Sequence, residues 1–395
     1  MTHSRTRYGR QMLGALVAIA TGVVVTAGPA AAAPAVGEVR FADSPNAVAG
    51  SYIVVLKDEA VGARTSVAVP AKAGELSKRY GGAVTRVYGA AVNGFAATLS
   101  APAARRLAAH PDVAYVEQDQ VVSINATQLN PPSWGLDRID QRDLPLDRAY
   151  TYPNTASNVR AYIIDTGIRF SHTDFGGRAT SGYDAVDGGS ADDCNGHGTH
   201  VAGTVGGVVH GVAKGVQLVA VRVLDCTGSG TLAGVIAGVD WVTQNAVKPA
   251  VANMSLGGGA SATLDNAVTN SIRSGVTYAV AAGNSTANAC NSSPARVPAA
   301  ITVGASTSTD ARAPYSNTGT CLDIWAPGSA ITSAWYTTNT ATNTISGTSM
   351  AAPHVAGAAA LVVSVTNWPP NLVRDYLVAN ATTGKPASPL LFVVN

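Results

Sequence analysis

From Trp134 to the C-terminus, short apolar runs alternate with longer segments that are rich in small residues. The runs have the length and composition of buried strands, and the segments between them have the spacing of helices. Strands that alternate with helices in this way predict an α/β fold with a doubly wound, mostly parallel sheet. The expected strands are 159–164, 216–223, 251–255, 276–281 and 300–303. The expected helices are 197–208, 231–245 and 264–274.

A smaller unit with a different pattern precedes this sheet. Its expected elements are a strand at 51–56, a helix at 73–80, strands with turns over 84–99, a helix at 102–109, and strands at 113–116 and 121–124. This β-α-β-β-α-β order over about 75 residues predicts a small α+β (ferredoxin-like) domain. The stretch contains no catalytic grouping of side chains. Residues 34–50 are rich in Ala, Pro and Val without periodicity, and we interpret them as a linker.

The first 33 residues have the features of an export signal. Three arginines within the first ten residues precede an apolar stretch from Leu13 to about Ala27, and a run of alanines follows. A membrane anchor is the alternative, but about 20 predominantly apolar residues are needed to span a bilayer, and glycines interrupt this stretch. We expect cleavage after Ala32 or Ala33. We expect no later stretch to be long and apolar enough for a membrane span, so the mature chain should be soluble and extracellular.

Composition excludes several classes of function. The 26 Lys and Arg residues nearly balance the 24 Asp and Glu residues, so the chain has neither a basic face for nucleic acid nor an acidic tail. A hydrophobic fraction of 46% excludes a disordered chain. The composition therefore fits a compact secreted enzyme.

Four cysteines agree with an oxidising compartment: Cys194, Cys226, Cys290 and Cys321. Three pairings are possible. Cys194 with Cys226 and Cys290 with Cys321 would close two loops of similar, moderate length, and this is the pairing that we expect. No C-x-x-C pair or His-Cys zinc spacing is present in the sequence, so we do not expect these thiols to bind metal.

Two polar patterns lie at expected element boundaries. Ile164-Asp-Thr-Gly167 places Asp165 at the end of a strand, where an α/β sheet has its reacting groups, although such an Asp is more often a turn residue. Asn195-Gly-His-Gly-Thr-His-Val-Ala-Gly203 places His197 at the start of a helix. Two His residues three apart suggest a metal site, but the zincin helix needs His at i and i+4 with a Glu between them, and no Glu is present.

A third pattern, Gly347-Thr-Ser-Met-Ala-Ala-Pro-His354, opens the helix through Val362. Ser349 at a helix start is ordinarily an N-cap. A nucleophile there would also have unpaired helix N–H groups facing the charge that develops on an attacked carbonyl. Pro353 is expected in about the first turn, where a missing N–H costs least. The pattern is not G-x-S-x-G, and the chain order Asp, His, Ser differs from that of α/β-hydrolases.

Together the three patterns closely resemble those of the subtilisin-like serine proteases (peptidase S8). Segments 134–140, 251–259 and 281–284 extend the resemblance to the proteinase K branch, and most closely to the disulfide-bonded aqualysin type. The resemblance covers the chain from about Ala126 to the C-terminus. The earlier unit resembles the inhibitor I9-like propeptide of these enzymes, through Asn93-Gly-Phe-Ala96 and the segment 113–119.

The resemblance implies the role of each reactive side chain. Ser349 would attack the peptide carbonyl, His197 would take and return its proton, and Asp165 would fix and stabilise the imidazole. Asn284 would be the side-chain donor to the oxyanion, together with the N–H of Ser349. His200 is excluded as the base, and we expect it to pack or bond within its helix.

The resemblance also implies how substrate binds. A protease that accepts many sequences holds the peptide backbone by strand pairing. The segments that resemble the family's peptide-clasping strands comprise Gly228, Ser229, Gly230, Ser255, Leu256 and Gly257. Gly283 and its small neighbours would leave an open, apolar pocket, which suggests large hydrophobic or aromatic residues before the scissile bond. Leu232 stands where relatives carry an aromatic residue.

Two structural Ca²⁺ sites are expected from the resemblance, with hard oxygen ligands. The first, of proteinase K type, would use the carbonyls of Pro298 and Ala300 and the carboxylate of Asp323. The second, of aqualysin type, would use Asp137, Asp140, Gln141 and Asp147, although Arg142 and Arg148 intervene. The alternative at each place is a solvated surface acid. No catalytic cofactor is expected.

We therefore expect a secreted, monomeric serine endopeptidase made as an inactive precursor. Its parts would be a signal peptide (1–33), a propeptide (34–125, folded over about 51–124) and a subtilisin-like catalytic domain (126–395). The propeptide would act as intramolecular chaperone and inhibitor, and self-cleavage near Asn125-Ala126 would release it. Protein and peptide substrates are the expected partners, without nucleic acid or, after signal removal, membrane. The competing classes are a catalytically silent binding or inhibitor protein and a serine hydrolase of esters.

Overall fold

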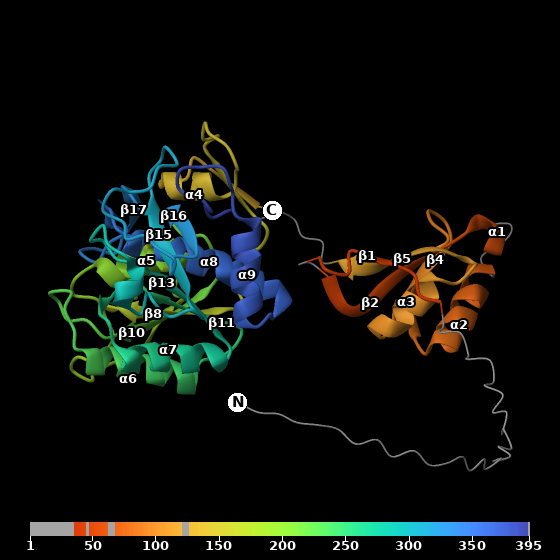
Figure 1. Cartoon of the computed structure of the whole chain (residues 1–395), viewed down its shortest axis with the longest axis horizontal. Helices are drawn as coiled ribbons and strands as arrows, with labels where there is room; N and C mark the ends of the chain where they lie inside the picture. The colour runs from red at the N-terminus through yellow and green to blue at the C-terminus, as the bar shows by residue number, and fades with distance from the viewer. Residues whose placement is uncertain (1–34, 45–46, 62–67, 121–125, 394–395) are drawn as a thin grey trace, which may run out of the picture. The chain divides into compact units, whose positions relative to one another are not determined.

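The computed structural model describes residues 35–44, 47–61, 68–120 and 126–393 (Figure 1). The expected export signal, its cleavage site and the expected strand at 121–124 lie outside these residues. The described chain forms two compact units, built around Tyr52–Glu117 and around Gln118–Asn395.

The N-terminal unit is a sheet with helices. Its strands lie in the order β1-β5-β2-β4-β3, and the side chains of Leu76, Phe95 and Leu107 are buried in its core. Part of the expected linker is strand, because β1 and the start of β2 fall within 34–50. The elements are β1 (Val39–Arg40), β2 (Ala47–Leu56), α1 (Asp58–Val61), α2 (Ala68–Tyr80), β3 (Ala83–Tyr88), β4 (Gly94–Thr98), α3 (Ala101–Ala108) and β5 (Val113–Gln120).

The C-terminal unit is built on a seven-stranded sheet in the order β16-β15-β13-β11-β8-β10-β9. Every pairing within it is parallel. Its strands are β8 (Arg160–Asp165), β9 (Ala179–Asp184), β10 (Gln217–Arg222), β11 (Ala250–Met254), β13 (Val276–Ala281), β15 (Ile301–Ser306) and β16 (Ile324–Pro327). Antiparallel pairs are formed by β6 (Ala126–Leu129) with β7 (Ala149–Tyr152), β12 (Gly258–Gly259) with β14 (Ser292–Ser293), and β17 (Ile331–Ala334) with β18 (Thr342–Ile345).

Helices cover both faces of this sheet, as β8 illustrates. Ala161 and Ile163 belong to the core that includes α5 and α8, whereas Tyr162 and Ile164 belong to the core that includes α6 and α7. This alternation confirms the expected doubly wound sheet. The helices are α4 (Trp134–Ile139), α5 (His197–Gly206), α6 (Leu232–Asn245), α7 (Ala262–Arg273), α8 (Thr348–Thr366) and α9 (Pro370–Asn380), with short 3₁₀ turns η1 (Thr173–Phe175) and η2 (Ala289–Asn291).

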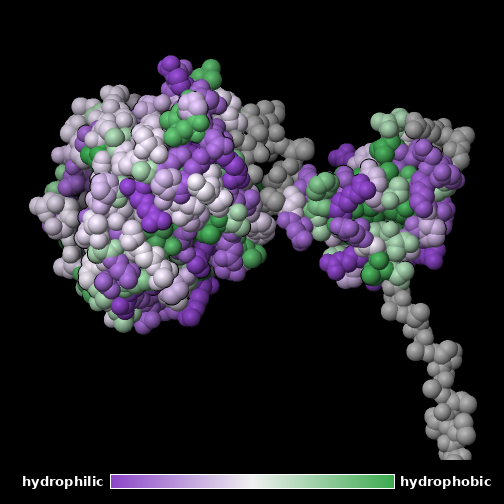
Figure 2. Space-filling model, turned by 45° about the horizontal axis from the view of Figure 1, so that its top comes forward, coloured by the Kyte–Doolittle hydropathy of each residue, from purple (hydrophilic) through white to green (hydrophobic). Residues whose placement is uncertain are grey.

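Helix α8 corrects the expectation about later apolar stretches. It is long and apolar enough for a membrane span, but most of it is buried inside the unit. Small residues let it pack closely: a Cβ on Gly357 would lie 2.6 Å from Cβ of Val212. On the face drawn in Figure 2, hydrophobic surface residues of this unit form small groups among hydrophilic ones. Helix α8 is therefore a core helix.

Candidate active site

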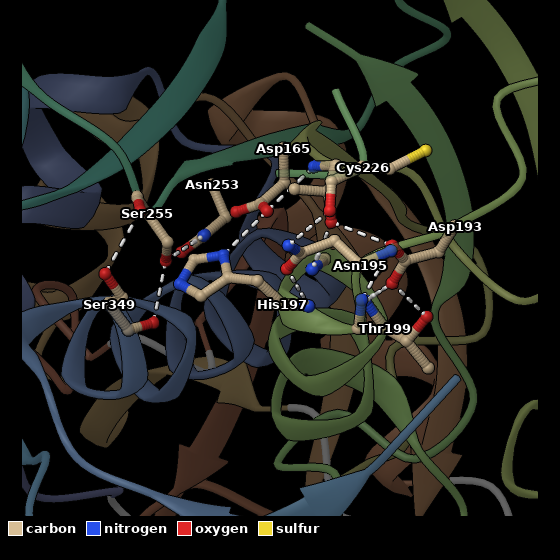
Figure 3. Close-up of polar contacts among 12 residues, drawn as sticks. Asp165, Asp193, Asn195, His197, Thr199, Cys226, Asn253, Ser255 and Ser349 are labelled. Atoms are coloured by element: carbon tan, nitrogen blue, oxygen red, sulfur yellow. Dashed lines mark hydrogen bonds and ion pairs between the residues drawn. The ribbon is translucent and has the colours of Figure 1, made fainter. Parts of the chain in front are cut away.

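Asp165 and His197 meet at the carboxyl end of β8. Asp165 ends the strand and is fully buried, while His197 begins α5 and keeps 26% of its side chain exposed. Nδ1 of His197 lies 2.7 Å from Oδ1 of Asp165 (Figure 3). An ionised carboxylate can only accept, so Nδ1–H donates and Nε2 remains as an acceptor. The pair suits a general base that is held in one tautomer.

A second buried carboxylate holds the loop before His197. Oδ1 of Asp193 accepts from the N–H groups of Asn195 and Gly196, both at 2.9 Å, and Oδ2 accepts from the N–H of Thr199 at 2.9 Å. These N–H groups lie around the start of α5, where helical partners are missing. Sequence analysis did not identify Asp193, although an acidic residue shortly before a helix start is a capping signal.

The two histidines of α5 have opposite environments. Burial lowers the pKa of His197, but the charge and hydrogen bond of Asp165, together with the charge of Asp193, raise it above the ordinary 6.5. Burial lowers the pKa of the fully buried His200 to about 3, so this ring is neutral. Its Nε2 lies 3.0 Å from the carbonyl of Ile331 on β17. His200 therefore bonds to a neighbouring strand rather than within its own helix, and its ring packs edge-to-face against Trp335.

Ser349 is the second residue of α8 and faces Ser255. Its hydroxyl donates to the Ser255 carbonyl at 3.1 Å, and the Ser255 hydroxyl donates to the Ser349 carbonyl at 2.7 Å (Figure 3). Within the described chain, the Ser349 hydroxyl thus bonds to Ser255 rather than to His197. For proton transfer it has to leave that carbonyl for the imidazole. Catalytic hydrogen bonds commonly tighten in this way only when substrate binds.

Asn284 lies beside the start of α8. Its Oδ1 accepts from the N–H and the hydroxyl of Thr348, at 2.8 and 2.9 Å. The oxygen is thereby fixed, and the amide nitrogen is left to donate. Gly283 precedes it with φ of +101°, and a Cβ there would lie 2.4 Å from Nδ2 of Asn317, so glycine is required. Asn284, Gly283 and Ser349 line one pocket of about 400 Å³.

A groove of about 610 Å³ runs beside this pocket. It contains both expected peptide-clasping segments, 228–230 and 255–257, as well as His197 and Leu232. Oδ1 of Asp225 holds the first segment by accepting from the N–H of Ser229 at 3.1 Å. The groove and the pocket share residues 255–259. A peptide backbone between the two segments would therefore pass Ser349 and His197.

Comparison with known proteins identifies the family. The model of the Subtilase family matches residues 157–393, and that of Peptidase inhibitor I9 matches residues 51–125. The chain belongs to the subtilase family. An extracellular serine proteinase of Thermus sp. (strain Rt41A) is 55% identical over 365 residues, which cover 89% of this chain and 86% of that protein. Alkaline serine exoprotease A of Vibrio alginolyticus is 51% identical over 86% of this chain and 65% of its own length.

A solved structure agrees with this assignment. The crystal structure of a cold adapted subtilisin-like serine proteinase is 54% identical and covers 70% of this chain and all of its own, with a TM-score of 0.65. This subtilase is thus a serine endopeptidase with an inhibitor I9 propeptide, as the sequence motifs predicted.

Two disulfides join segments of the subtilase unit. Cys194 is bonded to Cys226, and Cys290 to Cys321. The first ties the loop before His197 to the loop that leads into residues 228–230, and Nδ2 of Asn195 adds a hydrogen bond of 3.0 Å to the Cys226 carbonyl. The segment that carries His197 and one edge of the groove are therefore covalently connected.

We expect peptide mapping without reduction to recover these two cross-linked pairs. The bonded residues are 32 and 31 positions apart in sequence. Loops of this size should each stabilise the fold by about 3–4 kcal/mol if unstrained. Mapping after reduction is the control, and any crossed pair would contradict this pairing.

The expected aqualysin-type calcium site has oxygen atoms available for a cation. Oδ1 of Asp137 and Oδ1 of Asp140 are buried without a partner in the described chain. Burial, with the charges of Asp147 and Asp137, raises the pKa of Asp140 to about 7, so negative charge there is poorly compensated. The intervening Arg142 stacks on Phe392 instead. These residues fit Ca²⁺.

The same site is not a complete cage of acidic side chains. Among the described residues, no group of three or more His, Cys, Asp or Glu side chains is arranged to hold a metal by itself. An ion at Asp137 and Asp140 would thus need amide, carbonyl or water oxygens as well, which Ca²⁺ accepts readily.

The expected proteinase K-type site does not fit an ion. Oδ1 of Asp323 accepts from Nε and Nη2 of Arg374, at 3.0 and 2.6 Å, and Oδ2 accepts from the N–H of Thr302 at 2.8 Å. A guanidinium already supplies the positive charge that a calcium ion would bring to Asp323. We therefore do not propose a calcium site at Pro298, Ala300 and Asp323.

Proposed function

We propose that Asp165, His197 and Ser349 act as the catalytic triad of a secreted endopeptidase. The observation that carries this proposal is the 2.7 Å hydrogen bond between His197 and the buried Asp165, at a groove that adjoins the pocket of Ser349. Ser349 attacks the peptide carbonyl, and Nε2 of His197 takes its proton and returns it to the leaving amine. Asp165 keeps the imidazole in the required tautomer and stabilises its cationic form.

The developing oxyanion is stabilised by two donors, the amide nitrogen of Asn284 and the N–H of Ser349. Thr348 favours this role for Asn284 because it occupies the amide oxygen. Donors that are already oriented cost no reorganisation when the charge appears.

Substrate is held as an extended strand between 228–230 and 255–257. The pocket beside Ser349 is lined largely by small residues, among them Ala281, Ala282 and Ala295. This lining supports a preference for a large hydrophobic or aromatic residue before the scissile bond. Holding the backbone over several residues favours peptides over lipid esters as substrates.

The enzyme is proposed to be exported and self-processed. The relative from Thermus is named an extracellular serine proteinase, which supports export through a signal at 1–33. The inhibitor I9 match at 51–125 supports a propeptide over 34–125 that assists folding and inhibits the catalytic domain, 126–395. We propose that the mature enzyme is a monomer.

Casein hydrolysis in the presence of a serine-directed phosphonylating reagent tests this function. We expect complete loss of hydrolysis, and mass analysis should locate the adduct on Ser349. Labelling of another serine, or hydrolysis that survives full labelling, would contradict the triad.

The acid limb of kcat/KM should have its midpoint above pH 6.5. His197 must be neutral to accept a proton, and its pKa is raised, so activity increases as pH rises through that value. A pH profile with a neutral chromogenic peptide checks this. Asp187→Asn, which removes an exposed carboxylate, is the control and should leave the limb unmoved. A midpoint at or below 6.5 would contradict the raised pKa.

Chelation should lower the temperature of thermal inactivation, because an ion bound only by the folded state stabilises it by mass action. Asp140→Asn should reproduce this loss and abolish the response to chelator. Asp323→Asn should keep the response, since Asp323 is paired with Arg374. Inactivation unchanged by chelator, with no calcium detected in equilibrium dialysis, would refute the site.

A further inference from the structure

The carbonyl of Ser349 lies where helix α8 cannot supply a hydrogen-bond donor. In an α-helix this carbonyl accepts from the N–H four residues later, and that residue is Pro353. Proline has no N–H, and its ring crowds the same carbonyl. Pro353 is the sixth residue of α8 rather than part of its first turn, so the missing bond is a true interior bond. The Ser349 carbonyl needs a donor from elsewhere.

Ser255 provides that donor. Its hydroxyl lies 2.7 Å from the Ser349 carbonyl, and it must donate because a carbonyl only accepts. Nδ2 of Asn253 on β11 donates to the same hydroxyl oxygen at 2.8 Å (Figure 3). Asn253 is 1% exposed and Ser255 is 3% exposed, so water does not compete for these bonds. Asn253 thus directs the hydroxyl proton toward Ser349.

We propose that the Ser255 side chain is a positioning group for the nucleophile, which replaces the helix bond lost at Pro353. This inference rests on the proposed role of Ser349. Fixing the carbonyl fixes the backbone of Ser349, and with it the direction of its Oγ and its N–H.

The hydroxyl of Ser255 and its backbone carbonyl have different roles in this proposal. The backbone carbonyl belongs to the peptide-clasping segment and accepts from the Ser349 hydroxyl in the resting enzyme. Ser255→Ala retains that carbonyl and removes only the hydroxyl. Its effect should therefore fall on kcat, with KM changed less than about twofold, because the bond acts on the transition state.

The test is a double-mutant cycle with Pro353→Ala in the full-length enzyme. Ser255→Ala alone should lower kcat about tenfold, the effect expected for one buried hydrogen bond. Pro353→Ala restores an N–H four residues after Ser349 and should leave kcat close to that of the wild type. In the double variant this N–H takes over from the lost hydroxyl, so kcat should recover most of the tenfold loss.

Ser271→Ala is the matched control. Ser271 is a fully buried serine on α7 whose hydroxyl bonds to Tyr278 at 2.8 Å. It should lower thermal stability without changing kcat, and Pro353→Ala should not alter that result. A double variant as slow as Ser255→Ala, or equal rescue of an effect of Ser271→Ala, would overturn the inference. Active-site labelling of Ser349 in every variant keeps the outcome separate from failure of the triad itself.

Discussion

Ser349→Ala should accumulate as an uncut, signal-stripped precursor. Without the nucleophile, casein hydrolysis should fall on the order of 10⁶-fold, because the triad acts as a unit and only binding and oxyanion stabilisation remain. The proposed self-cleavage near Asn125-Ala126 would need the same hydroxyl, so the propeptide should stay attached. Expression in a protease-free host, followed by mass analysis and circular dichroism, would show a native-like fold of precursor size.

Two further outcomes separate the roles of the propeptide. Normal processing of Ser349→Ala in that host would show that another enzyme makes the cut. A separately produced 51–124 fragment should inhibit the mature enzyme as a tight, product-like ligand. If that fragment folds but does not inhibit, the inhibitor role is rejected while the triad is unaffected.

Asn284→Ala should lower kcat by about 10²–10³-fold with only a modest change in KM, the loss known for a side-chain oxyanion donor in subtilisin. The amide nitrogen meets the carbonyl oxygen mainly after that oxygen has become negative, so ground-state binding loses little. Steady-state kinetics on a peptide anilide measure both constants. Unchanged turnover would remove Asn284 from the site.

A matched variant comes from the same loop. Asn288 is an exposed asparagine whose Oδ1 accepts from the N–H of Cys290 at 3.0 Å, and it does not line the pocket. Asn288→Ala removes a similar amide and a local cap, and should leave kcat unchanged. A loss of kcat equal to that of Asn284→Ala would indicate that disturbance of the loop, rather than loss of the Asn284 amide, lowers turnover.

Local sequence patterns predicted the fold because a run of apolar residues directly indicates a buried strand. The apolar runs became strands of the parallel sheet, and Asp165 and His197 lie together because one ends β8 and the other begins α5. Such placement follows from topology, since the carboxyl ends of parallel strands share one edge.

Contacts between distant residues were not predictable in the same way. Arg374 lies 51 positions from Asp323 in sequence, and nothing near Asp323 indicates that a guanidinium will occupy its carboxylate. The bond from Ser255 to Ser349 spans 94 positions. The one local signal for this bond is Pro353. It indicates a missing helix donor only if α8 has already begun at Ser349. Helix ends are poorly defined by sequence, so the missing donor became clear only in three dimensions.

The burial of α8 bears on how the enzyme survives among copies of itself. Ser349, the proposed nucleophile, is carried by a core helix, so a molecule that unfolds enough to be digested also loses its activity. Each molecule that becomes a substrate is thereby lost from the active enzyme. At low concentration, the rate of self-digestion should be second order in active enzyme. At high concentration, the rate constant for loss of each molecule should level off at the rate constant of spontaneous unfolding.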